Sequence, residues 1–164
     1  MEKVMMNKNA KLSEHFTLGE LTKTKHVTAD GNIPSHVVIE NLKRLCPWLE
    51  ELRRVWNVEC GRWNENTHEA KDEPIIINSG YRSPAVNLLA GGSKTSNHLT
   101  GCAVDIRCVG KEQMIRYAAI LLDIADGTKQ EFDELLLEQH GSVCWLHFAV
   151  RPQDNRRRIE FLKA

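Results

Sequence analysis

Residues 96–105 have the sequence SNHLTGCAVD, which joins a polar segment to the start of a predicted strand. His98 and Asp105 are seven residues apart, and Gly101 between them lets the backbone turn, so both side chains can converge on one point. Zinc accepts nitrogen and carboxylate ligands, and a catalytic zinc site uses three of them and keeps one position open. The stretch therefore supplies two candidate metal ligands, and a third must come from elsewhere.

His147 is the candidate third ligand. In CWLHFAV, residues 144–150, the two-residue period of a strand places His147 and Trp145 on one face and the intervening apolar residues on the other. Other interpretations remain open on spacing alone, since His98 could be a surface residue and His147 a hydrogen-bonded core histidine. Asp105 lies inside an apolar strand, where a buried carboxylate needs a partner.

The remaining elements are predicted from hydrophobic periodicity and from turn and cap residues. A capping box at Thr17–Glu20 predicts a short helix, and Ser35 begins a longer helix that Pro47 should kink or divide. In chain order, the further predictions are a solvated loop at 57–73, a strand at 75–77, a helix from Ser83–Pro84 to Gly91, a polar loop at 91–100, a strand at 103–108, a helix at about 111–126 closed by Gly127, and a hairpin of strands 135–138 and 143–150 joined through 139–142. This order predicts an α+β fold, with N-terminal helices packed on a mostly antiparallel sheet that carries the zinc site.

Size and charge narrow the class of protein. The 164 residues suit one domain, predicted at 13–164 after a loose N-terminal lead-in at 1–12. Lys plus Arg and Asp plus Glu each count 22, so a net charge of zero gives no electrostatic case for a nucleic acid partner. No apolar run approaches the roughly 20 residues of a membrane span, and the N-terminus has no signal-like run, so we expect a cytoplasmic protein as synthesised. The five cysteines are an odd number and favour reduced thiols, while the oligomeric state stays open.

Three motifs together resemble the M15 family of zinc peptidases: INSGYRS at 77–83, S-x-H-x-x-G-x-A-x-D at 96–105 and W-x-H at 145–147. That family includes D-Ala-D-Ala carboxypeptidases and phage endolysins, and it shares a zinc-site fold with the hedgehog signalling domain. FDELLLE at 132–138 and SEHFTL at 13–18 resemble its phage-like branch. The likeness extends from about residue 13 to residue 150.

The resemblance implies a Zn²⁺ ion held by His98, Asp105 and His147. It also implies that Arg82 holds the substrate and the developing oxyanion, and we expect Tyr81 and Ser96 to line the site. The implied substrate is a D-amino-acid-containing peptide of bacterial peptidoglycan, cut as a carboxypeptidase or an endopeptidase. With no export signal, a phage-type lysin fits best. A cytosolic D,D-dipeptidase and a non-catalytic, zinc-containing cell-wall binding module are the alternatives.

The general base is the part of the site at which the sequence departs from the M15 pattern. A zinc hydrolase needs a carboxylate near the attacking water, and many M15 members place an Asp or Glu three residues before the last His. Here that position is Cys144, so we predict that Glu138, on the neighbouring strand, serves instead. Glu134 and His140 are the fallback candidates.

Strand register decides whether Glu138 can serve. If the hairpin loop is residues 139–142, Glu138 lies opposite Val143, about 13 Å along the strands from His147, which is too far. If a wider loop sets Glu138 opposite Trp145, the offset falls to about 7 Å, within reach of a shared water.

Overall fold

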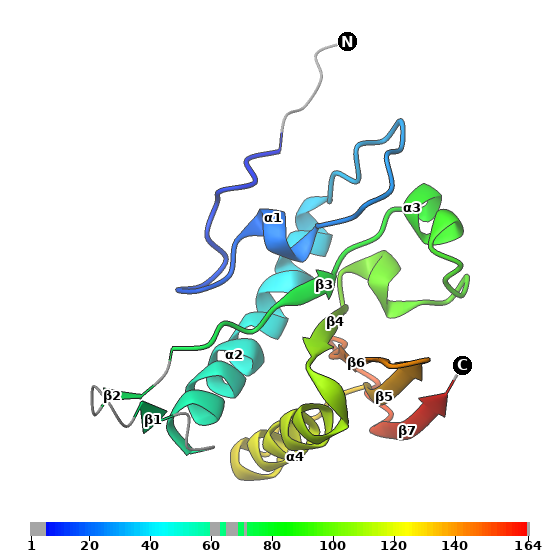
Figure 1. The fold of residues 1–164 in the computed structure, drawn as a ribbon. Coiled ribbons are helices and arrows are strands. Elements are labelled where there is room, and N and C mark those ends of the chain that lie inside the picture. Colours follow the sequence, from blue (N-terminus) through cyan, green and yellow to red (C-terminus); the bar gives the residue numbers. More distant parts are fainter. Residues whose placement is uncertain (1–5, 60–62, 65–68, 71, 164) are drawn as a thin grey trace.

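A five-stranded sheet with the strand order β3-β4-β6-β5-β7 forms the centre of the molecule (Figure 1). The computed structural model describes residues 6–59, 63–64, 69–70 and 72–163. The strands are β3 (Ile77–Ser79), β4 (Ala103–Cys108), β5 (Glu134–His140), β6 (Val143–Ala149) and β7 (Arg158–Lys163). All neighbouring strands are antiparallel except β5 and β7, which run parallel. The predicted α+β class and mostly antiparallel sheet are confirmed.

Two of the described helices precede the strands of this sheet in the chain, and the others lie between its strands in sequence. They are α1 (Leu18–Leu21), α2 (His36–Glu59), α3 (Pro84–Leu89), the 3₁₀ helix η1 (Asn97–Thr100) and α4 (Gly110–Thr128). A separate two-stranded sheet pairs β1 (Trp63–Asn64) with β2 (Glu69–Ala70). Among the described residues, no helix has both the length and the apolar character that a membrane crossing requires.

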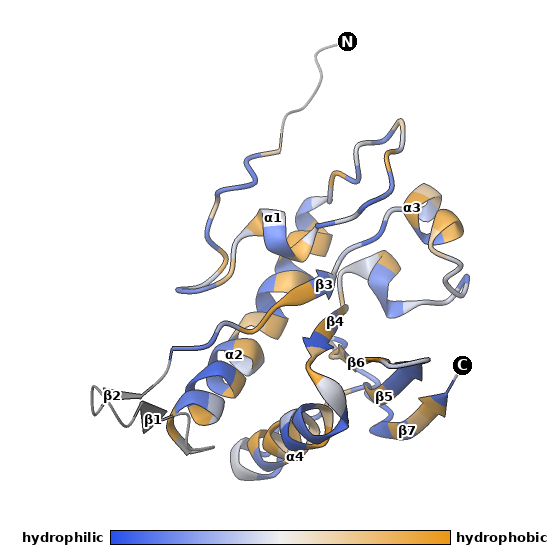
Figure 2. Cartoon of the chain, in the orientation of Figure 1, coloured by the Kyte–Doolittle hydropathy of each residue, from blue (hydrophilic) through white to orange (hydrophobic). Residues whose placement is uncertain are grey.

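The hydrophobic core lies between one face of the large sheet and the helices α2 and α4. Trp48 of α2 contacts Phe148 of β6 with ring centroids 5.2 Å apart, and Trp56 of α2 contacts Tyr117 of α4 at 5.0 Å. Both helices alternate between hydrophobic and hydrophilic stretches (Figure 2), as expected when one side of a helix is buried. The packing leaves the opposite face of the sheet available for a site.

Helix α2 continues through Pro47, so of the two predicted outcomes, a kink or a division, the division does not occur. A proline inside a helix removes one backbone hydrogen bond and costs about 3 kcal/mol. The residues on either side of it, Cys46 and Trp48, are both buried in the core. Burial of the flanking turns therefore offsets the local cost, which a purely local reading of the sequence does not include.

Several other boundaries differ from the predictions. Strand β3 begins at Ile77 instead of residue 75, and Gly127 lies inside α4, which ends at Thr128 with Lys129 in the left-handed region at φ 56°. The predicted loop at 57–73 contains the end of α2 and the strands β1 and β2, and its residues 60–62, 65–68 and 71 lie outside the described residues. Strand β4 and the Ser83 cap of α3 are confirmed.

The N-terminal segment contacts the core, and the described cysteines are reduced. Met6, Ala10 and Leu12 of the predicted lead-in pack against the core, while residues 1–5 lie outside the described residues. The four described cysteines are buried and free, and Cys60 is outside the described residues.

The hairpin of β5 and β6 is tighter than predicted. His140 pairs with Val143, so the turn contains only Gly141 and Ser142, and Gly141 has a positive φ of 59°. Glu138 lies opposite Trp145 in this register. The register that favours Glu138 is therefore the observed one, although it comes from a shorter turn and not from the wider loop that was expected to produce it.

Candidate metal centre and active site

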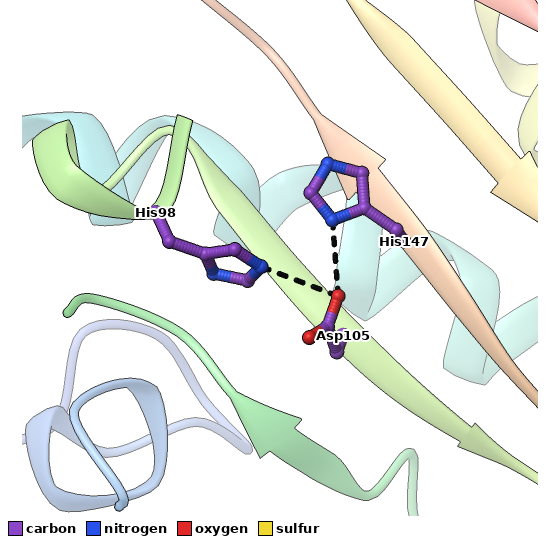
Figure 3. Close-up of side chains that lie close together, drawn as sticks. All are labelled: His98, Asp105 and His147. Atoms are coloured by element: carbon purple, nitrogen blue, oxygen red, sulfur yellow. Dashed lines mark hydrogen bonds and ion pairs between the residues drawn. The ribbon is translucent and has the colours of Figure 1, made fainter. Parts of the chain in front are cut away.

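Three buried side chains converge on the face of the sheet opposite the α2–α4 core: His98 from η1, Asp105 from β4 and His147 from β6 (Figure 3). Asp105 Oδ1 lies 3.3 Å from His98 Nε2 and 3.0 Å from His147 Nδ1. One ligand atom from each residue lies within 4.8 Å of the others. The structure therefore brings together the three predicted metal ligands, and their donor set of two imidazole nitrogens and one carboxylate is that of a catalytic zinc site.

The sequence around His98 fixes its backbone position. Ser96 caps η1, its hydroxyl accepting a hydrogen bond from the His98 N–H at 3.2 Å. Gly101 ends η1 in the left-handed region at φ 73°, and a Cβ there would lie 2.8 Å from the backbone oxygen of Val38. Glycine is thus required both by conformation and by close packing, and the chain then enters β4 toward Asp105.

Hydrogen bonds orient the His98 ring. Its Nδ1 lies 2.7 Å from the carbonyl oxygen of Gly80, which can only accept, so Nδ1 carries a hydrogen and donates it. In the neutral ring, Nε2 then presents its lone pair toward Asp105 and the centre of the group. This is the orientation a metal-binding histidine requires.

His147 is oriented in the same way by a carboxylate on β5. Its Nε2 lies 3.1 Å from Glu134 Oε1, and its Nδ1 faces Asp105. Burial alone would lower the pKa of His147, but hydrogen bonds to Asp105 and Glu134 outweigh it and raise the pKa to about 9. The two carboxylates thus stabilise positive charge at this point, and the same field favours a bound cation.

Arg82 lies at the edge of the candidate metal group. Its Nη2 is 3.2 Å from Asp105 Oδ2, and its Nε donates to Ser79 Oγ at 3.0 Å. Burial tends to raise the pKa of Asp105, but the charges and hydrogen bonds of His98 and His147 hold it well below its usual range. Asp105 is therefore an anion shared between the histidines and a guanidinium.

A cavity of about 940 Å³ opens beside these residues. Its lining includes both candidate histidine ligands and the acidic and basic residues around them: Arg82, Ser96, His98, Asp105, Glu134, Glu138, Trp145 and His147. Tyr81, predicted to line the site, is buried in the hydrophobic core and is not among the residues lining this cavity. The other predicted site residues share one concave surface.

Glu138 lies on the sheet face that carries His147, because Glu138 is opposite Trp145 and Trp145 is two residues from His147. Its Oε2 accepts a hydrogen bond from Trp145 Nε1 at 2.9 Å, and Glu138 is among the residues that line the cavity. Burial, followed by the nearby Asp105 charge, raises the pKa of Glu138. A carboxylate with a raised pKa near a metal group has the character of a general base.

The other candidate positions for the general base are each unsuited to that role by their contacts or their location. Glu134 is held by His147, and that hydrogen bond is the main reason its pKa falls to about 2. His140 is exposed at the hairpin end and is not among the residues lining the cavity. Cys144, three residues before His147, is buried in the hydrophobic core, as an odd offset along a strand requires.

A buried polar network that the sequence analysis did not identify supports the site. Asp133 has no exposed surface and receives two hydrogen bonds from the Arg156 side chain, at 3.0 and 2.8 Å. Asn97, next to His98, donates to Asp133 at 2.7 Å and to Glu134 at 2.6 Å. The network links the segment that carries His98 to the carboxylate that orients His147.

One signal of this network was present in the sequence. Asp133 and Glu134 are consecutive acids at the entrance to an apolar strand, and buried carboxylates need partners. Their arginine partners come from the segment between β6 and β7 and from the first residue of β7, and this pairing depends on tertiary structure.

Comparison with known families agrees with this geometry. The sequence model of the family described as Peptidase M15 matches residues 14–134. That range contains Arg82, His98 and Asp105, whereas Glu138 and His147 lie beyond it and are placed beside the others by the sheet register. No curated protein sequence matches the chain.

Proposed function

The chain belongs to the Peptidase M15 family and is a metallopeptidase, and we propose that it is a zinc-dependent enzyme that hydrolyses D-amino-acid-containing peptides of bacterial peptidoglycan. The observation that carries this proposal is the buried group of His98, Asp105 and His147, with Glu138 on the same sheet face and in the same cavity. The cell-wall substrate and a role as a phage-type lysin are inferred from the resemblance of the sequence motifs.

The proposed ion is zinc, held by His98 Nε2, His147 Nδ1 and a carboxylate oxygen of Asp105. The hydrogen bonds to Gly80 and Glu134 support this choice, because they direct both imidazole lone pairs to one point. When bound, zinc would polarise the scissile carbonyl and lower the pKa of a water molecule.

Glu138 is the proposed general base. Its Oε1 accepts the proton of the attacking water and then passes it to the departing amine, while Trp145 holds Oε2 in place. The raised pKa of Glu138 assists the first of these steps, because it makes the carboxylate a stronger proton acceptor.

Arg82 is the proposed electrostatic partner of the substrate. Its guanidinium lines the cavity next to Asp105 and is fixed by Ser79, so it needs little reorganisation when negative charge develops on the scissile carbonyl oxygen. A planar guanidinium can also hold a substrate carboxylate through two hydrogen bonds.

The test is cleavage of purified peptidoglycan by the zinc-loaded protein, with the released peptides identified by mass spectrometry. We expect new peptide ends from the wild type and none from Glu138→Gln. Metal-loaded wild-type protein that binds the wall but releases nothing would support the binding module instead. Cleavage of free D,D-dipeptides without wall cleavage would support the dipeptidase.

A further inference from the structure

A second cavity, of about 460 Å³, adjoins the active-site cavity, and Arg82 and Ala90 line both. Its other walls come from the loop after α1 (Lys23, Thr24, Lys25 and His26), from Asn78 and Ser79 of β3, and from Leu89 of α3. In Figure 1 the loop after α1 lies beside α3. The cleft that starts at the candidate metal group therefore continues past Arg82. We call the second space the lysine cavity.

The lysine cavity is positively charged. Its lining residues include Lys23, Lys25 and Arg82 but no carboxylate, and both lysines are exposed. Within the part of the chain that the structure describes, neither lysine forms an ion pair. Asp30 on the same loop is held by Thr28 and the backbone N–H of Asn32, and it does not line the cavity.

At the opposite end of the cleft, the cationic side chains are paired with carboxylates. Arg151 and Arg156 both pair with Asp133, and Arg158 pairs with Glu134 and Glu160. These arginines are already neutralised by protein carboxylates. The uncompensated positive charge along the cleft is therefore concentrated at the lysine cavity.

We propose that the lysine cavity is a subsite for a carboxylate carried by the peptide substrate, on the part of the peptide that extends past Arg82. This inference rests on the proposed function, because it adds a specificity site to the same cleft. Two flexible ammonium groups can both donate to one carboxylate without requiring a single geometry. Arg82 would then stand between the scissile bond and the recognised charge.

The experiment uses pairs of synthetic cell-wall-type peptides that differ only in one group, a free side-chain or α-carboxylate in one and the carboxamide in the other. The exchange is made in turn at each carboxylate outside the scissile bond. Wild-type protein is compared with the double variant Lys23→Gln, Lys25→Gln. The control double variant, Lys43→Gln, Lys111→Gln, removes the same charge from exposed positions outside both cavities.

Wild type and control should prefer one carboxylate peptide over its carboxamide. Exposed ion pairs are individually weak, so the lysine variant should raise the KM for that peptide by about fivefold with little change in kcat. Its effect on the carboxamide should be much smaller, and the wild-type preference should decline with added salt. Equal effects on both peptides, or a wild-type preference in the lysine variant, would overturn the subsite.

Binding of the same peptides, measured by calorimetry, separates this inference from the proposed function. If wild-type protein cleaves both peptides without preference, the subsite is wrong and the function stands. If it cleaves neither, the function fails, and the subsite stands only if the carboxylate peptide binds more tightly than the carboxamide and the lysine variant loses that difference.

Discussion

At the scale of single residues, each candidate histidine ligand is oriented by a neighbouring group that can only accept a hydrogen bond. The Gly80 carbonyl and the Glu134 carboxylate accept hydrogen bonds from the outer nitrogens of His98 and His147. The inner nitrogens then face Asp105. Residue types and spacing made the three ligands candidates, and the resemblance to the M15 family implied that they bind one ion. Neither revealed these outer partners, because Gly80 and Glu134 reach the histidines only through the folded sheet.

Replacement of Glu134 tests the outer partner of His147. Glu134→Ala removes the acceptor that orients the ring, so we expect zinc affinity to fall by about 10- to 100-fold while the fold is retained. Competition with a chromogenic chelator gives the dissociation constant. Glu131→Ala, an exposed glutamate three residues away, is the control. Unchanged affinity in Glu134→Ala would show that His147 is oriented by other contacts.

Glu138 is the residue on which the proposed chemistry depends most. Glu138→Gln keeps size and the ability to accept from Trp145 but cannot take a proton, so cleavage of cell-wall peptide should fall by about 100-fold or more. Zinc content and melting temperature should stay close to wild type. Wild-type turnover in this variant would exclude Glu138 as the base.

At the scale of elements, local signals predicted some boundaries well. The capping box at Thr17, the Ser83–Pro84 helix start and strand β4 all depend on neighbouring residues and were correct. Continuity of α2 through Pro47 and the two-residue turn at Gly141 depend on packing and pairing with distant segments. The hairpin turn sets the position of Glu138 opposite Trp145, which is why its role could be stated only conditionally from the sequence.

Asp133 connects the elements that frame the site, since it precedes β5 and binds Arg156 just before β7 and Arg151 after β6. Burial would raise its pKa, but hydrogen bonds from Arg156 and Asn97 outweigh it and lower the pKa to about 2. An unfolded Asp titrates near 3.9, so this carboxylate contributes stability above about pH 4 that is lost as the pH falls through about 2.

Asp133→Asn should therefore be less stable than wild type at neutral pH, by about 2 kcal/mol or more. The difference should shrink between about pH 4 and pH 2, because the wild type loses its ionised carboxylate there. Urea unfolding at a series of pH values measures it. A difference that stays constant down to pH 2 would contradict the assigned role.

At the scale of the whole molecule, the sheet separates packing from chemistry. Helices α2 and α4 cover one face and form the core, and the other face carries the metal group, Glu138 and the cavity. The formal charges of the chain sum to zero, but they are unevenly distributed along the cleft. Among the described residues, the arginines at one end form ion pairs and the two lysines at the other form none. The net charge therefore gave no indication of this local asymmetry.

The most direct test of this account is the metal content of the purified protein by elemental analysis. A three-ligand site predicts about one zinc ion per chain in the wild type and in the control His36→Ala, whose histidine is exposed and does not line the cavity. His98→Ala and His147→Ala should each hold much less than one. Full zinc occupancy in both of these variants would contradict the assignment of His98, Asp105 and His147 as the metal site.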